Sequence, residues 1–293
     1  MLKTETPSTA HTSLDAYAIP QLVAAFANDQ MDAVLAVKDA IAQIAAAVEA
    51  AVPRLEAGGR LIYVGAGTSG RLALLDSVEL YPTFSWPKER AVALLAGGNQ
   101  AVFEAMEGAE DNLEQGTADM QATKAGATDV VLLLASSGTT PYVLGALRAA
   151  RAMGALTIGI ANNTGAPVAL EAEIGITLDT GSELISGSTR LKAGTSQKIM
   201  LNTFSSAVMI RLNKVYGNLM VDLKPTNAKL IRRAVHLTVL ATGADETTAR
   251  QTLDRCQYKV KVAIVAIARS IPVEEAELRL AAARGSVRAA MAN

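Results

Sequence analysis

The sequence predicts an α/β protein: a doubly wound, mainly five-stranded parallel sheet, preceded by an N-terminal helix and followed by a small helical domain. Three observations predict this fold class. Five short apolar runs alternate with helix-length segments between residues 61 and 178, the order typical of parallel sheets with right-handed crossovers. Most runs are apolar at nearly every position, as expected of strands covered on both faces. Beyond about residue 226 such runs stop, and only helical patterns continue.

The elements are expected in the following order. A first helix covers about 31–57, because Val34, Val37 and Ile41 recur at helical spacing. The expected strands are 61–64, 91–95, 129–134, 156–160 and 174–178. The helices between and after them are expected near 69–80, 100–124 (broken), 141–153 and 191–213. In the C-terminal part we expect a helix over 228–241, a turn and cap over 242–245, and three more short helices.

These elements suggest three parts: an N-terminal tail and helix over 1–50, a sheet domain over 51–214, and a helical domain over 226–293. The first 14 residues are rich in Ser and Thr, and we expect them to form a loose or partner-docked tail. The segment 213–225 is expected to connect the sheet domain with the helical domain.

The composition excludes several classes of function. The 293 residues carry a formal net charge of −1, so the basic excess typical of nucleic-acid binders is missing. One cysteine (Cys256) and two histidines (His11 and His236) argue against a disulfide, a zinc site and Ser-His-Asp chemistry. We therefore expect no metal site built from cysteines or from several histidines. No signal segment or membrane-length apolar run is visible, so we expect a cytoplasmic protein without a membrane partner.

Ligands of open parallel sheets bind at the carboxyl ends of the strands, so the loops there are examined first. The loop 65–71 has the pattern Gly-x-Gly-x-x-Gly, a weak sign of a dinucleotide site. The acid that such a site needs after the second strand is missing, because Glu89 precedes that strand. The loop also departs from a phosphate-binding P-loop, with Arg71 in place of Lys and Leu72 in place of Ser or Thr. A nucleotide site remains a weak alternative.

Short hydroxyl side chains follow two of the strands and precede helices. They are Thr68, Ser69, Ser136, Ser137, Thr139 and Thr140. Free backbone N–H groups and hydroxyls at helix N-termini suit a phosphate monoester. The alternative is ordinary helix capping by Ser and Thr. Two such loops at the same end of one sheet favour the phosphate site.

Carboxylates are the most available acid and base groups in a chain with two histidines. Asp76 and Glu79, three residues apart, are expected to share a helix face. Glu107, Glu110 and Asp111 lie at an expected helix break. Each of these acids could simply be solvated. Together with a phosphate pocket, however, they suggest proton transfer on a phosphorylated sugar.

Four long segments carry a family resemblance: 58–72, 107–111, 187–195 and 216–222. In them the chain resembles the N-acetylmuramic acid 6-phosphate etherases, members of the sugar-isomerase (SIS) superfamily. The similarity extends from about residue 15 to the C-terminal end. It implies a lyase that cleaves the D-lactyl ether of N-acetylmuramic acid 6-phosphate by elimination and hydration. The products are N-acetylglucosamine 6-phosphate and D-lactate, and the setting is cell-wall amino-sugar recycling.

The resemblance also implies roles for particular residues. Glu79, the last residue of the Asp-x-x-Glu segment, corresponds to the family's proton donor, and Glu110 corresponds to its second catalytic acid. We assign Glu79 as the acid and Glu110 as the base. The family further implies a UBA-like C-terminal domain, a homodimer, and no metal or redox cofactor.

Three departures from the family pattern affect substrate preference more than reaction type. They are the segment 79–83, the loss of an arginine at Thr139, and the reduced N-terminal motif at 4–8. Two alternatives remain. A non-catalytic sugar-phosphate sensor of the glucokinase-regulatory-protein type would keep the hydroxyl loops without needing both carboxylates, and an aldose–ketose isomerase would lack the extended etherase-like segments. Retention of both Glu79 and Glu110 favours the etherase.

Overall fold

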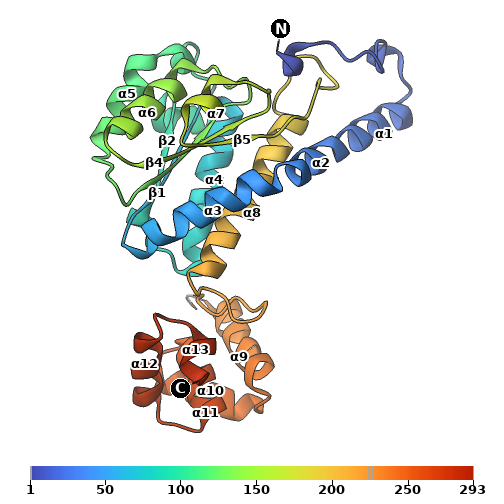
Figure 1. The fold of residues 1–293 in the computed structure, drawn as a ribbon. Helices are drawn as coiled ribbons and strands as arrows, with labels where there is room; N and C mark the ends of the chain where they lie inside the picture. The colour runs from blue at the N-terminus through green and yellow to red at the C-terminus, as the bar shows by residue number, and fades with distance from the viewer. Residues whose placement is uncertain (1, 224, 226, 293) are drawn as a thin grey trace. The chain divides into compact units, whose positions relative to one another are not determined.

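The computed structural model describes residues 2–223, 225 and 227–292. The chain divides into two compact units (Figure 1). The first unit comprises Met1–Val78 and Lys88–Ser205, and the second comprises Glu79–Pro87 and Ser206–Asn293. The three-part division expected from the sequence stays a prediction.

A five-stranded parallel sheet forms the centre of the first unit, which confirms the predicted fold class. The strands are β1 (Leu61–Gly65), β2 (Ala91–Leu95), β3 (Val130–Leu134), β4 (Leu156–Ala161) and β5 (Ile174–Thr177). Their order is β2-β1-β3-β4-β5, with Val64 of β1 opposite Leu94 of β2 and Leu133 of β3. The order reverses direction between β1 and β3, so the loops after these two strands flank the crevice where ligands bind in such sheets.

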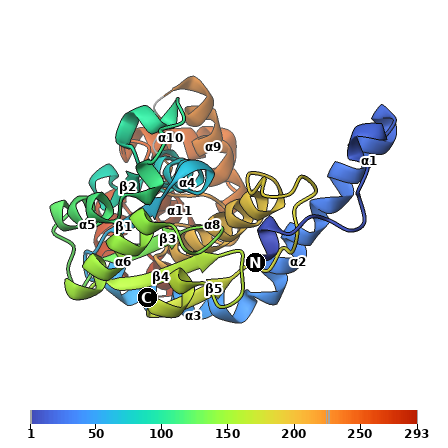
Figure 2. The same ribbon diagram turned by 90° about the horizontal axis from the view of Figure 1, so that it is seen from above.

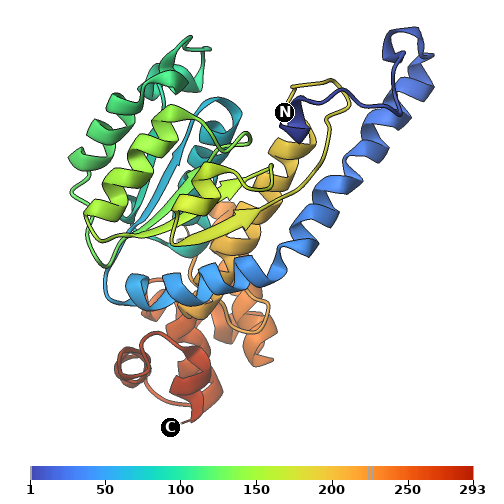
Figure 3. The same ribbon diagram turned by 45° about the horizontal axis from the view of Figure 1, so that its top comes forward.

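Helices cover both faces of the sheet (Figures 1 and 3). One face carries α5 (Leu113–Ala122), α6 (Pro141–Ala152) and α7 (Pro167–Glu171). The other carries α3 (Ile41–Glu56), α4 (Gly67–Phe84) and α8 (Lys192–Arg211). For the connecting helices, right-handed crossovers require this division: α4 connects β1 outward to β2, while α5, α6 and α7 connect strands in the opposite direction.

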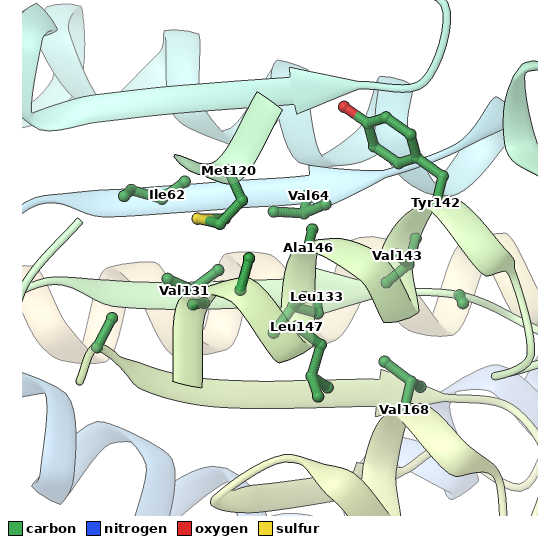
Figure 4. Close-up of a cluster of buried hydrophobic side chains, with 14 of the residues drawn as sticks. Ile62, Val64, Met120, Val131, Leu133, Tyr142, Val143, Ala146, Leu147 and Val168 are labelled. Carbon is green, nitrogen blue, oxygen red and sulfur yellow. The ribbon is translucent and has the colours of Figure 1, made fainter. Parts of the chain in front are cut away.

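One cluster of buried apolar side chains lies between the sheet and the helices α5 and α6 (Figure 4). Alternate residues of β1 and β3 point into it, and Met120 and Leu147 cover them from the helices. Each such apolar side chain contributes about 1.5–3 kcal/mol when fully buried. Gly116 allows α5 to approach α6 closely, since a Cβ at this position would lie 1.9 Å from the Tyr142 carbonyl oxygen. This packing holds the sheet rigid beneath its loops.

The N-terminal helices differ from the expectation. The single helix expected over 31–57 is two helices, α2 (Met31–Asp39) and α3, which meet at Ala40. A further helix, α1 (Ile19–Asp29), precedes them, and α1 and α2 extend away from the sheet as an arm (Figure 2). The break at Ala40 has a backbone ψ of 5° and is marked by neither Gly nor Pro, so the sequence gives no sign of it.

The second unit contains five helices after residue 226 in its described part. They are α9 (Ala228–Thr242), α10 (Glu246–Arg255), α11 (Val260–Arg269), α12 (Val273–Ala282) and α13 (Val287–Ala292). Four helices therefore follow α9 where the sequence predicted three. Gly243 ends α9 with a φ of 73°, and the Asp245 carboxylate accepts the N–H of Thr248 at the start of α10, as expected for the turn and cap. Across the described chain, no helix reaches both the length and the apolarity of a membrane span.

Candidate active site

A cavity of about 440 Å³ opens at the carboxyl ends of β1 and β3. All six hydroxyl residues singled out in the sequence line it: Thr68, Ser69, Ser136, Ser137, Thr139 and Thr140. The structure thus brings the two predicted loops together in one site. Glu110 and Asp111 line the same cavity, whereas Glu79 does not.

The first loop turns sharply from β1 into α4. Gly65 and Gly70 touch, because a Cβ on Gly65 would lie 2.7 Å from the Gly70 Cα. This close approach places Thr68 and Ser69 in the first turn of α4, where backbone N–H groups have no partner within the helix. The Ser69 hydroxyl oxygen lies 3.5 Å from that of Ser136, so the two loops meet. The first loop therefore presents both N–H donors and hydroxyls to the cavity.

The second loop connects β3 with α6. The Ser137 Oγ accepts hydrogen bonds from the backbone N–H and the hydroxyl of Thr139, both at 3.2 Å. Thr140 occupies the N-cap position of α6, yet its side chain makes no capping hydrogen bond. Capping therefore does not explain the Thr140 hydroxyl, which lines the cavity instead.

Buried amides behind the second loop hold Ser136 in place. The Gln197 Nε2 donates to the Ser136 Oγ at 3.0 Å and to the Asn162 Oδ1 at 2.9 Å. The Asn163 Nδ2 donates to the Ser136 carbonyl oxygen at 2.9 Å. These residues were not predicted from the sequence, although two consecutive asparagines directly after a buried strand are a visible signal.

The N-terminal tail docks at the cavity, close to the loop before α8 (Figures 1 and 3). Thr4 is fully buried and exchanges hydrogen bonds with Asn163, at 3.3 Å through its backbone N–H and 3.0 Å through its hydroxyl. The Gly187 N–H donates to the Thr4 carbonyl oxygen at 3.1 Å. The expectation of a loose or partner-docked tail is therefore wrong for this segment. These long-range bonds bring Glu5 into the cavity lining. They could not be predicted from local sequence periodicity.

Glu110 lies on an exposed single turn, Ala109–Asp111. Gly108 precedes this turn with a φ of 71°, a conformation that favours glycine. Glu110 also lines a second, smaller cavity, so its carboxylate borders two spaces.

Asp76 and Glu79 have different surroundings on α4. Asp76 is 3% exposed and accepts hydrogen bonds from the Tyr63 hydroxyl at 2.9 Å and the Ser205 hydroxyl at 3.2 Å. Burial and the adjacent Asp76 carboxylate raise the pKa of Tyr63, which keeps it a neutral donor. Glu79 is exposed. The two acids lie three apart on α4, as expected, but they are not equivalent: an offset of about 60° around the axis places Asp76 at a buried edge and Glu79 at an exposed one.

Acids and hydroxyls line the site. Its described lining includes the acidic residues Glu5, Glu110 and Asp111, and neither Lys nor Arg. Among the residues that the structure describes, no three His, Cys, Asp or Glu side chains gather as metal ligands would. The arrangement can bind an anion through hydroxyls and two helix N-termini, and it can transfer protons through carboxylates.

Two family models match the chain. The glucokinase regulatory protein N-terminal SIS domain matches residues 43–151, and the SIS domain matches residues 109–207.

Relatives that match over nearly the full length of this chain indicate a more specific family than the domain models do. An N-acetylmuramic acid 6-phosphate etherase of Deinococcus radiodurans is 56% identical over 98% of this chain and 94% of its own length. An enzyme of the same name from Mycolicibacterium smegmatis is 46% identical over 99% of this chain and 97% of its own. Among solved structures, a ligand-bound protein of E. coli CFT073 is similar in fold, with a TM-score of 0.50 and 15% identity. That match covers 69% of this chain and 97% of the E. coli chain.

Proposed function

The chain belongs to the N-acetylmuramic acid 6-phosphate etherase family, and we propose that it cleaves the D-lactyl ether of N-acetylmuramic acid 6-phosphate. The products are N-acetylglucosamine 6-phosphate and D-lactate. The observation that carries the proposal is the presence of Glu110 in the same cavity as the six hydroxyl residues. A small substrate in this cavity can therefore contact the phosphate-binding hydroxyls and the Glu110 carboxylate at the same time.

The phosphate occupies the hydroxyl loops. Backbone N–H groups at the starts of α4 and α6 and the hydroxyls of Ser137 and Thr140 surround it. Helix N-termini carry partial positive charge, which compensates for the missing basic side chain. This interaction is remote from the reacting carbons, so its binding energy can orient them.

The reaction is an elimination followed by a hydration. In the open-chain sugar the carbon 2 proton lies next to an aldehyde, and Glu110 removes it. The bond between carbon 3 and the lactyl oxygen then breaks, and Glu79 protonates that oxygen as D-lactate leaves. Water adds to carbon 3, and a proton returns to carbon 2. Two carboxylates suffice for these proton transfers.

Glu79 acts from a second copy of the chain in this proposal. On α4, Glu79 follows Thr68 by eleven residues, which corresponds to about 16 Å of helix rise. A hexose spans roughly half that length between its phosphate and its carbon 3 oxygen, and Glu79 does not line the phosphate cavity. In a homodimer, Glu79 of one subunit can instead reach the phosphate cavity of the other, which accounts for this separation.

The N-terminal arm provides a surface for this dimer. Ile19 and Val23, one turn apart on α1, are 78% and 62% exposed, and Met31 at the start of α2 is 60% exposed. Contiguous exposed apolar side chains of this kind mark interaction surfaces.

We also assign the reaction to the cytoplasm, because a phosphorylated sugar is charged and remains in the compartment in which it forms.

The proposal is tested by incubating the purified chain with N-acetylmuramic acid 6-phosphate and measuring D-lactate with a D-lactate dehydrogenase. We expect stoichiometric release of D-lactate and N-acetylglucosamine 6-phosphate. Tight binding of the sugar phosphate without any release would instead indicate a sensor of the glucokinase-regulatory-protein type, and would refute the etherase.

A further inference from the structure

A second cavity of about 220 Å³ adjoins the phosphate cavity. Both cavities are lined by Ala66, Gly67 and Glu110. Otherwise the smaller cavity is formed by Arg71 and by side chains of the segment 96–109, most of them small and apolar. Glu110 therefore lies at the junction of the two spaces.

Arg71 is the only lysine or arginine among the described residues that line either cavity. Its Nε donates to the carbonyl oxygens of Ala101 at 3.0 Å and Val102 at 3.3 Å, and its Nη2 donates to that of Glu104 at 3.0 Å. These acceptors are neutral, and Arg71 forms no ion pair with the described part of the chain. Its charge is therefore available to an anion in the cavity.

Arg71 lies near the start of α4, four positions after its first residue, Gly67. The three hydrogen bonds to carbonyl oxygens hold its guanidinium in place at the cavity. A fixed, half-buried and unpaired guanidinium is suited to recognising a carboxylate.

The proposed substrate carries two anionic groups, the phosphate on carbon 6 and the carboxylate of the lactyl group. We infer that the Arg71 cavity is the lactyl subsite, in which the guanidinium pairs with the lactyl carboxylate; this inference rests on the proposed function. The phosphate lies in the larger cavity among the hydroxyls. Carbons 2 and 3 then lie between the two anion sites, beside Glu110.

The remaining lining fits a lactyl group. Ala101 and Met106 provide apolar contact for its methyl group, and the volume suits a three-carbon acid. Glu107 also lines this cavity and repels a carboxylate, so binding there depends on Arg71. After the elimination D-lactate remains in this space until it is released.

The experiment compares two ligands that differ in the lactyl group. Binding of N-acetylmuramic acid 6-phosphate and of N-acetylglucosamine 6-phosphate is measured by calorimetry in a Glu110→Gln background, which prevents turnover. Adding Arg71→Gln is expected to weaken binding of the lactyl-bearing ligand by about 10- to 100-fold, because a charge-assisted pair of hydrogen bonds is lost. Binding of the ligand without the lactyl group is expected to stay within about twofold, because the phosphate cavity is untouched.

Arg148→Gln is the matched control, since Arg148 is an exposed arginine of α6 that pairs with Glu171 at 2.9 Å. Arg148→Gln should change the affinity for neither ligand.

Arg71→Lys keeps the positive charge but loses the paired N–H donors of the guanidinium. It should weaken binding of the lactyl-bearing ligand alone, by an intermediate amount, and it replaces Arg71→Gln in the test if that variant does not fold. Equal weakening of both ligands would show that Arg71 only supports the loop carrying Glu110, and would overturn the subsite. Unchanged binding of both ligands would overturn it as well. D-lactate release by the wild-type chain is scored separately, so a failure of the proposed function is distinguished from a failure of the subsite.

Discussion

In the proposed site, Ser137 and Thr140 are the hydroxyl residues that we expect to bind the phosphate most directly. Both hydroxyls line the cavity, and Thr140 is not engaged in capping. Replacing both with Ala should weaken N-acetylglucosamine 6-phosphate binding by about 1–3 kcal/mol for each charge-assisted bond lost, measured by calorimetry. Thr203→Ala is the control, because that exposed hydroxyl bonds only the Ile199 carbonyl of its own helix. Unchanged affinity in a folded double variant would refute the phosphate site.

In the proposed mechanism Glu110 and Glu79 act on different atoms, so substitutions of the two residues should have different effects. Glu110→Gln should abolish both D-lactate release and exchange of the carbon 2 proton with heavy water. Glu79→Gln should suppress release but retain some exchange, because deprotonation does not require a protonated leaving group. We expect losses of release of about 10²–10⁴-fold for each variant. Proton NMR of the substrate in heavy water measures both quantities. The opposite pattern would reverse the two roles.

Local sequence motifs predicted some of these residues and not others. The hydroxyl loops were predictable, since each follows a strand directly and the sheet order brings both ends together. Glu5 was not, because Thr4 and Asn163, 159 residues apart, hold it in place. Arg71 was noticed only as a mismatch to a P-loop. Its significance depends on a cavity formed with the segment 96–109, which no local pattern describes.

At the scale of elements, the start of α8 is a buried electrostatic junction. Glu183 is fully buried and accepts the backbone N–H groups of Lys192 at 3.1 Å and Ala193 at 2.9 Å. The Lys192 ammonium pairs with Asp29 at 2.8 Å and Asp32 at 3.0 Å. These bonds fix α8 against the helical arm. They also support the loop before α8, which contributes Gly187 and Thr189 to the cavity.

This junction predicts a pH dependence of stability. Burial raises the pKa of Glu183 above its ordinary value of 4.5, and the backbone N–H groups of Ala193 and Lys192 offset only part of that rise. Protonation of Glu183 therefore favours the folded state. Its contribution to the free energy of unfolding is complete below pH 4.5 and is lost as the pH rises through the raised pKa. Glu183→Gln removes this loss, so its free energy of unfolding should decline less above pH 4.5 than that of the wild type.

Urea denaturation at a series of pH values from 4.5 to neutrality measures this difference. The Arg60–Asp129 pair does not interfere. Burial alone would raise the pKa of Asp129, but the hydrogen bonds from Arg60 hold it below 3.8, so its contribution is lost only at lower pH. Glu49→Gln, an exposed change on α3, should match the wild type. Parallel stability curves for Glu183→Gln and the wild type would contradict the burial effect.

Elements were predicted best where buried apolar runs define them. The five strands differ from expectation by one residue or less at each end, because continuous apolar runs bounded by loops leave little choice. The helices were less predictable where alanine is abundant, as at Ala40, since alanine suits a helix and its end equally. Four short helices follow α9 where three were expected, because helices of ten residues or fewer show too little of a period to be counted reliably.

In the proposed dimer, each complete site requires residues from two chains. Glu79→Gln and Glu110→Gln homodimers should each be nearly inactive. Mixing them under exchange conditions should restore about a quarter of wild-type activity, because half of the dimers are mixed and half of their sites are complete. Light scattering establishes the dimer in the same samples. Failure of the mixture to recover activity, or a fully active monomer, would contradict the shared site.

Labelled water tests most directly whether the ether is cleaved by elimination and hydration, as we propose. The wild-type chain is incubated with N-acetylmuramic acid 6-phosphate, once in heavy water and once in oxygen-18 water, and the products are analysed by NMR and mass spectrometry. We expect a deuteron on carbon 2 of N-acetylglucosamine 6-phosphate and oxygen-18 in its carbon 3 hydroxyl, with the ether oxygen retained in D-lactate. A product that keeps its original carbon 2 proton, or oxygen-18 in the hydroxyl of D-lactate, would contradict it.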